Sequence, residues 1–150
     1  MIKDTVALVI AAMVIAIAIL VSRANATIDY FTPSRADPWM DIQLWARANT
    51  KPSSLFITPP ELSGFRIFSE RNQLGDNKDG ALCSFYHFYA ILWKERMAKL
   101  ESFHNFSRDE IMQLANKYGA GYIVVENIQA EQWDLEAAYA NEDYIIYLAP

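Results

Sequence analysis

The chain has 150 residues, which is enough for one domain, and a formal net charge of −5 at pH 7. It contains no block of five or more basic residues, and beyond Lys117 every charged residue is acidic. This pattern argues against a nucleic-acid partner. The single cysteine, Cys83, excludes a disulfide within the chain. Because an aromatic run surrounds Cys83, we expect it to be a small buried apolar side chain.

The first feature in chain order is an apolar run without a charged side chain, residues 5–22. As a helix rising about 1.5 Å per residue, it reaches about 27 Å, just enough to cross the hydrocarbon core of a bilayer. The sequence therefore predicts a transmembrane anchor. The alternative is a signal peptide cleaved after Ala26, since residues 24–26 form an A-x-A site. The run is longer than a typical signal core, which favours the anchor.

Three parts follow from this interpretation. Residues 1–26 are the transmembrane anchor or signal peptide, residues 27–37 a juxtamembrane linker, and residues 38–150 an extracytoplasmic domain. Both fates of the first part place the domain outside the cytoplasm if the short N-terminus stays inside. The expected localisation is a single-pass protein of the inner or plasma membrane, with a secreted protein as the alternative.

The domain begins with a predicted helix and two predicted short strands. Asp37 is a good N-cap and Pro38 a good first helical residue, so a helix is expected from Pro38 to about residue 48. Residues 55–58 are apolar and end at two prolines, which predicts a short buried strand. In residues 65–69 apolar and polar side chains alternate, which predicts a second strand.

The remaining elements alternate between helices and apolar strands. A long amphipathic helix is expected over residues 81–100. Ser107 and Glu110 have capping-box spacing, so a helix is expected from Arg108 to Tyr118. The other predictions are strands at 122–125 and 144–148 and a helix at 130–139. This order predicts an α/β fold in which a small sheet is covered by helices.

Motifs for a metal, a nucleophile or a phosphate loop are not found. The two histidines, His87 and His104, lie seventeen residues apart, and the sequence has neither HExxH nor CxxC. It has no GxSxG, GxxxxGK or GxGxxG. We therefore expect no metal and no cofactor, and the sequence shows no catalytic constellation.

A set of polar and basic residues is the remaining candidate for chemistry. Its members are Arg66, Ser69, Arg71, Lys78 and Asp79, with Arg96 as a further candidate. They fall at predicted strand ends and loops, where α/β domains bind ligands. Guanidinium groups suit phosphate or carboxylate, so binding of an anionic or phosphorylated sugar is one interpretation. The other is that the arginines pair with nearby acidic residues and join the loop to the long helix.

Aromatic residues crowd the predicted helix 81–100: Phe85, Tyr86, Phe88, Tyr89 and Trp93. We expect most of them to be core residues. Any that are exposed could contact lipid or a partner subunit.

Five stretches together resemble a known family: WARANTKPSSLFITPP, GFRIFSER, NKDG, LWKERMAKL and LANKYGAGYIVVE. They resemble the C-terminal tail of uncharacterised bacterial polytopic membrane proteins, which in turn look like lipid-linked-sugar glycosyltransferases of the multi-helix membrane type. The layout is also similar to soluble parts of oligosaccharyltransferase-like proteins. The resemblance covers about residues 37–126 and implies a small extracytoplasmic α/β domain.

Seven residues of this chain match the recurring polar and aromatic positions of that tail: Arg66, Ser69, Arg71, Lys78, Asp79, Trp93 and Arg96. The resemblance assigns them no role. The chain departs from the family in having one hydrophobic segment and none of the loops that carry the family's catalytic carboxylates. The resemblance therefore implies a non-catalytic, membrane-tethered accessory module. A polytopic membrane protein or a lipid-linked glycan is its expected partner, beside the membrane itself.

Overall fold

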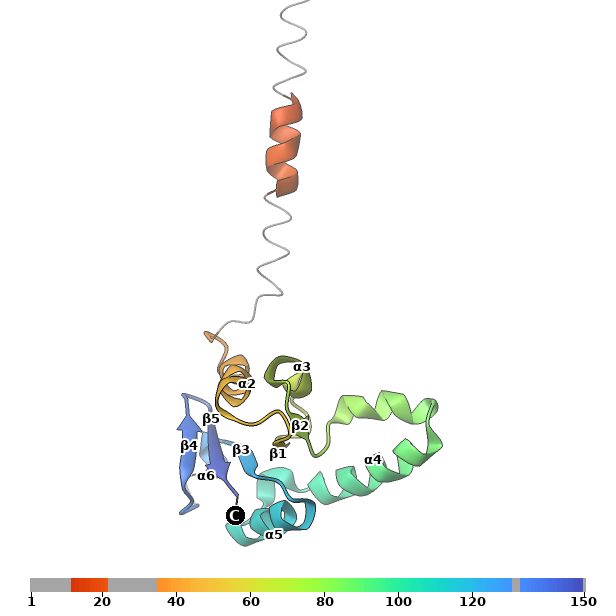
Figure 1. Cartoon of the computed structure of the whole chain (residues 1–150), viewed down its shortest axis with the longest axis vertical. Helices are drawn as coiled ribbons and strands as arrows, with labels where there is room; N and C mark the ends of the chain where they lie inside the picture. The colour runs from red at the N-terminus through yellow and green to blue at the C-terminus, as the bar shows by residue number, and fades with distance from the viewer. Residues whose placement is uncertain (1–11, 22–34, 131–132, 150) are drawn as a thin grey trace, which may run out of the picture. The chain divides into compact units, whose positions relative to one another are not determined.

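The computed structural model describes residues 12–21, 35–130 and 133–149. The chain separates into two compact units, Met1–Pro33 and Ser34–Pro150. In the first unit the described residues are α-helical (Figure 1). Among the described ranges, no helix is both long and apolar enough to cross a membrane. The predicted anchor or signal peptide and the predicted linker fall largely outside the described residues.

The second unit is built on a mixed five-stranded sheet, which confirms the predicted α/β class (Figure 1). The strand order is β2-β1-β3-β5-β4. Strand β1 is parallel to both β2 and β3, whereas β5 is antiparallel to β3 and β4. The strands are β1 (Leu55–Ile57), β2 (Asn72–Gln73), β3 (Tyr122–Glu126), β4 (Ala137–Ala140) and β5 (Tyr144–Leu148).

Helices connect and cover these strands. The α-helices of the unit are α2 (Pro38–Asn49), α3 (Phe65–Ser69), α4 (His87–Leu100), α5 (Arg108–Tyr118) and α6 (Asn127–Ala130). Two 3-10 segments flank α4, namely η1 (Asn77–Ser84) and η2 (Phe103–Asn105). The crossover from β1 to β2 contains α3, and the crossover from β2 to β3 contains α4 and α5.

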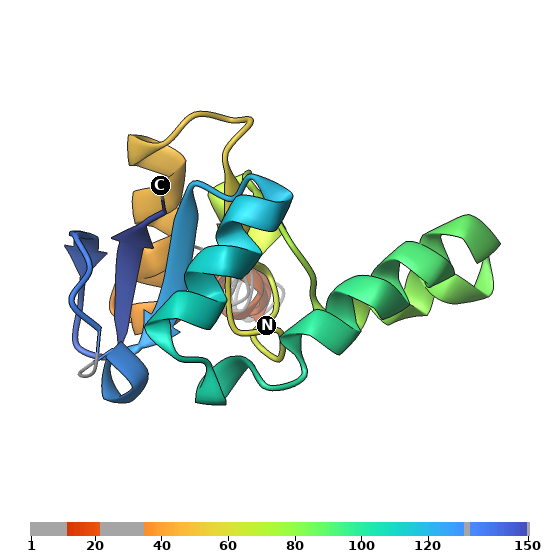
Figure 2. The same ribbon diagram turned by 90° about the horizontal axis from the view of Figure 1, so that it is seen from below.

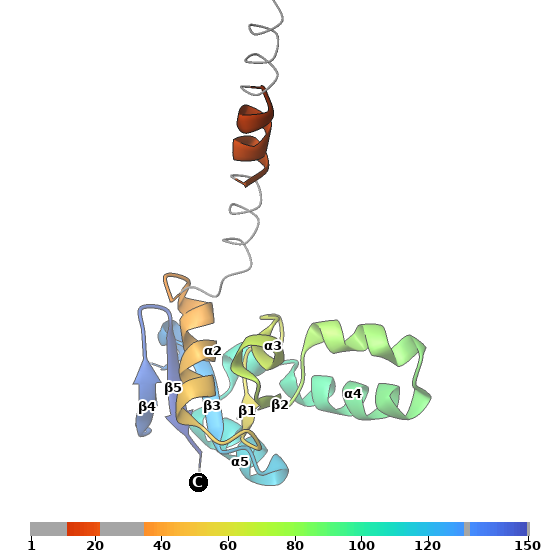
Figure 3. The ribbon, with the colours of Figure 1, turned by 45° about the horizontal axis from the view of Figure 1, so that its top comes forward.

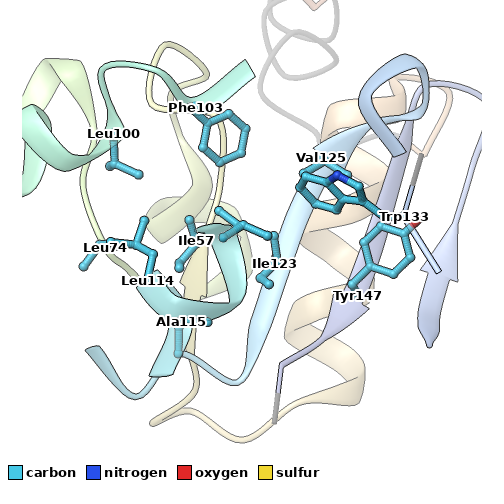
Figure 4. Close-up of a cluster of buried hydrophobic side chains, with 12 residues drawn as sticks. Ile57, Leu74, Leu100, Phe103, Leu114, Ala115, Ile123, Val125, Trp133 and Tyr147 are labelled. Carbon is cyan, nitrogen blue, oxygen red and sulfur yellow. The ribbon is translucent and has the colours of Figure 1, made fainter. Parts of the chain in front are cut away.

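The sheet has a core on each face, because neighbouring residues of β1, β3 and β5 point to opposite sides. Helices α2 and α3 cover one face, with the buried cluster Ile42, Ala46, Phe56, Phe65, Val124 and Ile146. The other face packs against α5, η2 and the end of α4. Figure 4 shows this second cluster, in which Leu100, Phe103 and Leu114 approach Ile57 and Ile123, and Trp133 lies beside Tyr147.

The predictions that rest on local capping chemistry are confirmed. The Asp37 carboxylate accepts from the backbone amide of Trp39 at 2.9 Å, at the start of α2. Helix α5 begins with the complete capping box of Ser107 and Glu110 and ends at Gly119 in the left-handed conformation. The strands predicted at 55–58, 122–125 and 144–148 are also present as β1, β3 and β5.

The predicted strand at 65–69 is wrong, because these residues form the short helix α3. Gly64 has a φ of 90°, and its carbonyl accepts from the amides of Ile67 and Phe68. The Ser69 hydroxyl donates to the carbonyl of Phe65, one helical turn away. Phe65 is fully buried, but Ile67 is 73% exposed. Five alternating residues were too few to distinguish one strand face from one helical turn.

The predicted helix at 130–139 is also wrong, since residues 137–140 form β4. Strand β4 pairs with β5, with Tyr139 opposite Ile146. The predicted helix at 81–100 is divided, because residues up to Ser84 belong to η1 and α4 begins only at His87.

Segments η1 and α4 form a hairpin that projects away from the sheet (Figures 2 and 3). The indole nitrogen of Trp93 on α4 donates to the carbonyl of Asp76, just before η1, at 2.9 Å. The end of α4 returns to the core through the buried Leu100. The hairpin is thus fixed at its base and extends outward from it.

Candidate functional site

The predicted basic set is divided by the fold into separate internal contacts. On α3, Arg66 pairs with Asp79 of η1, with 2.6 Å between its guanidinium and one carboxylate oxygen. The same guanidinium donates to the carbonyl of Gln73 at 3.0 Å. Burial and then the negative charge of Asp79 raise the pKa of the nearby Tyr89. Arg66 thus pairs with a nearby acidic residue, as one of the two sequence interpretations expected, but the pair joins α3 to η1 rather than a loop to the long helix.

Arg71 is a buried clamp on the end of α2. Its side chain donates to the Thr50 hydroxyl at 2.9 Å and to the carbonyls of Thr50, Arg47 and Glu70 at 2.6, 2.5 and 3.1 Å. Only 7% of the residue is exposed. Ser69 is fully buried, and its hydroxyl accepts from the Arg71 amide. The guanidinium thus satisfies carbonyls at the C-terminus of α2, where the helix cannot pair them itself.

The other two basic candidates lie apart from this clamp. Lys78 contacts the Ser63 hydroxyl at 2.8 Å, and Arg96 reaches the carbonyl of Leu74 at 3.4 Å. Arg66 and Arg96 border one open hollow of about 540 Å³, while Arg66, Lys78 and Asp79 border another of about 420 Å³. Ser69 and Arg71 border neither hollow. The six predicted residues are not brought into one site.

The most unusual surface lies at the end of the η1–α4 hairpin. Five apolar or aromatic side chains are exposed there, and together we name them the hairpin tip: Leu82, Phe85, Tyr86, Phe88 and Ile91. Phe85 is 79% exposed and Phe88 74%. The expectation that the aromatic residues of this segment are mainly core is therefore wrong for three of the five. Tyr89 and Trp93 are half-buried, because they face η1.

The expectation for Cys83 is also corrected, since it is half-buried in η1 rather than fully buried. This follows from the hairpin geometry. The segment projects away from the sheet (Figure 2).

One group was missed by sequence reasoning. The side chains of Glu61, His104 and Glu126 come together, with their potential ligand atoms all within 4.8 Å of one another. His104 Nε2 lies 2.8 Å from a carboxylate oxygen of Glu61. The three residues are distant in sequence, so motif spacing could not find them. One signal in the sequence could have indicated this group: Glu61 follows β1 and Glu126 ends β3. The carboxyl ends of adjacent parallel strands meet at one edge of a sheet, so these two side chains are expected to lie close together.

Comparison with known proteins gives one match. A family described as "Domain of unknown function (DUF6798)" matches residues 37–100, which is less than half of the chain and runs from the N-cap of α2 to the end of α4. No curated protein and no solved structure matches the chain. The matched region includes the Arg71 clamp and the whole hairpin, but ends before His104 and Glu126.

Proposed function

We propose that the chain is a membrane-tethered extracytoplasmic module without a catalytic role, and that its hairpin tip inserts into the head-group region of the bilayer. The observation that carries this proposal is the exposure of the tip. Contiguous exposed apolar patches mark sites of protein or membrane interaction. Tyr side chains favour the boundary between lipid and water, because the ring is apolar and the hydroxyl can reach water. Exposed Phe and Leu side chains favour the adjacent apolar layer.

Two further features favour lipid over a soluble partner. Helix α4 carries Lys94, Arg96 and Lys99 against the single acid Glu95, in a chain whose overall charge is −5. A locally basic, aromatic element in an acidic protein fits an anionic lipid surface. The apolar run 5–22 is the second feature, because as an anchor it would hold the hairpin near the bilayer.

The resemblance to the tail of glycosyltransferase-like membrane proteins motivates the biological setting of the proposal. The module would be an accessory part of a membrane glycan-handling system, beside a polytopic membrane protein or a lipid-linked glycan. Direct binding of an anionic or phosphorylated sugar through Arg66, Arg71 and Lys78 is the weaker alternative. These three side chains already donate hydrogen bonds within the protein. Arg71 also lies outside the two hollows that Arg66 borders.

Fractionation tests the tether. Full-length protein should remain in the membrane pellet after an alkaline wash, and its intact mass should include residues 1–26. A soluble species that starts at Thr27 would instead indicate signal cleavage after Ala26, and would contradict the tether.

The depth of a spin label tests the insertion of the tip. Ser84 is exposed and adjoins the tip, so Ser84→Cys in a Cys83→Ser background accepts a label there. In lipid vesicles we expect this label to be accessible to oxygen and protected from a water-soluble relaxation agent. The control is Gln113→Cys on the exposed side of α5, which should show the opposite pattern. An aqueous label at both positions would rule out insertion.

A further inference from the structure

The group of Glu61, His104 and Glu126 lies where the connections that follow β1 and β3 run to opposite faces of the sheet. Strands β1 and β3 are adjacent and parallel, so their carboxyl ends share one edge. After β1 the chain passes to α3, whose Phe65 packs in the core on one face. After β3 it passes through α6 to Trp133, which packs in the core on the other face. Such a divergence opens a crevice between the strands, and α/β sheets bind ligands there.

Each of the three residues comes from a different part of this crevice. Glu61 is in the turn after Pro59 and Pro60, which end β1; His104 is in η2; and Glu126 is the last residue of β3. The position of His104 is fixed by its neighbour Phe103, which is buried in the core (Figure 4). The burial of Phe103 therefore fixes the position of His104, while about half of the His104 side chain remains exposed.

A buried oxygen with no partner lies at the same place. The side-chain nitrogen of Gln129 donates to the carbonyl of Phe103 at 2.7 Å, next to His104. Its side-chain oxygen is buried and accepts no hydrogen bond from the described residues. Gln129, His104, Glu126 and Trp133 line one hollow of about 390 Å³. A buried polar atom without a partner is costly, so this oxygen favours a bound group that can donate to it.

We propose that Glu61, His104 and Glu126 form a binding site for a divalent transition-metal ion, with Zn²⁺ as the best-fitting chemistry. Imidazole nitrogen and carboxylate oxygen are both Zn²⁺ ligands, and a set of three protein ligands leaves one position of a tetrahedral ion open. Gln129, whose side-chain oxygen has no partner among the described residues, lines the hollow beside this group. Around a tetrahedral ion, ligand atoms about 2.0–2.1 Å from the metal lie about 3.3 Å apart. Exposed Glu61 and half-buried Glu126 can close that gap by rotating their side chains.

This inference does not depend on the membrane tether or the hairpin tip. It states only that the carboxyl edge of the sheet binds one metal ion per chain. The 2.8 Å contact between His104 and Glu61 would be replaced by bonds of both side chains to the ion. Binding therefore requires deprotonated His104 and should weaken at acidic pH.

The test uses the full chain without an affinity tag, in mild detergent, with Zn²⁺ and Co²⁺ as probes. Titration calorimetry should show one Zn²⁺ per chain, and Co²⁺ should give visible absorption bands of a nitrogen–oxygen site. His104→Ala and Glu126→Gln should each weaken Zn²⁺ binding at least tenfold, because loss of even an outer-shell partner of a ligand typically costs about 10–100-fold in metal affinity. Glu126→Gln is nearly isosteric and should fold, so it tests the loss of one ligand even if His104→Ala does not fold.

His87→Ala is the matched control, because His87 is the other histidine of the chain and is exposed at the start of α4. It should bind Zn²⁺ as the unmodified chain does. Unchanged binding in both His104→Ala and Glu126→Gln would overturn the proposal, as would the absence of any stoichiometric binding. A thiolate charge-transfer band with Co²⁺ would also overturn it, because that band would assign the ion to Cys83.

Discussion

Arg71 shows how one buried cation can position two elements. It lies between α3 and β2, and its donors are directed at the carbonyls of Arg47 and Thr50 at the end of α2. A helix C-terminus carries unpaired carbonyls and a partial negative charge, so a guanidinium fork there supplies both hydrogen bonds and charge. A further bond, to the Thr50 hydroxyl, fixes the turn that leads into β1.

Removing this clamp should destabilise the domain. We expect Arg71→Ala to lower the free energy of unfolding by about 1–3 kcal/mol, because three backbone carbonyls lose a charged donor. Arg71→Lys should recover only a small part, since an ammonium group cannot reproduce the fork. Urea unfolding of the full chain in mild detergent measures both changes.

The matched control for this prediction is Arg108→Ala. Arg108 is exposed and pairs with its neighbour Asp109, so its removal should change the stability by less than about 0.5 kcal/mol. If Arg71→Ala unfolded at the same urea concentration as the unmodified chain, Arg71 would be free for a ligand. Binding of a sugar phosphate would then become the better interpretation.

At the scale of elements, the η1–α4 hairpin depends on one close contact between a glycine and an indole ring. A Cβ atom on Gly80 would lie 2.8 Å from the ring of Trp93, closer than carbon atoms approach. Trp93 cannot easily turn away, because its nitrogen is bonded to the carbonyl of Asp76. The two segments therefore lie together only if residue 80 has no side chain.

Gly80→Ala should loosen the hairpin. Overpacking of this kind costs about 1–3 kcal/mol. We expect faster hydrogen exchange in residues 77–97, with little change in β3 and β5. Gly121→Ala is the control, because nothing lies within 4 Å of a Cβ at that position. Equal exchange in both variants would show that the contact does not hold the hairpin.

The elements differ in how far the sequence alone could predict them. Helices α2 and α5 were predictable, because their ends are set by side chains within three residues of the cap. Helix α3 was not, since its geometry depends on the left-handed Gly64 and on burial of Phe65 against α2 and β1. Strand β4 was missed because its assignment comes from pairing with β5, which a local helical pattern cannot reveal.

Sites built from distant residues were the least predictable part. The basic residues were singled out by their nearness in sequence, but the fold uses Arg66 and Arg71 to join elements. The group of Glu61, His104 and Glu126 was not expected, because the two histidines lie seventeen residues apart and the sequence has neither HExxH nor CxxC. Glu61 lies in the turn after β1 and Glu126 at the end of β3, so the group could be recognised only after the parallel pairing of these strands was known.

At the scale of the whole domain, a buried carboxylate joins the beginning of the fold to its end. Asp41 on α2 accepts from the hydroxyl of Tyr139 at 2.6 Å and from the side chain of Asn141 at 3.1 Å. It also pairs with Arg35 at 2.8 Å. About one hundred residues separate the two sides of this contact, so it closes α2 onto β4 and the turn before β5.

This contact predicts how the stability of the domain changes in acid. Burial raises the pKa of Asp41, but its hydrogen bonds to Tyr139 and Asn141 and the charge of Arg35 outweigh burial, so the pKa lies below its ordinary value of 3.8. A carboxylate with a lowered pKa in the folded state stabilises the fold above pH 3.8. That contribution is lost as the pH falls from 3.8 through the folded-state pKa.

Asp41→Asn should therefore have two effects on urea unfolding. Near pH 7 the variant should be about 1–3 kcal/mol less stable, because a charged acceptor of three donors is lost. Below pH 3.8 its stability should fall less steeply than that of the unmodified chain, so the two curves converge. Asp109→Asn is the control, since that carboxylate is 79% exposed and should leave the stability near pH 7 almost unchanged. Parallel curves for Asp41→Asn and the unmodified chain in acid would show that Asp41 does not link folding to protonation.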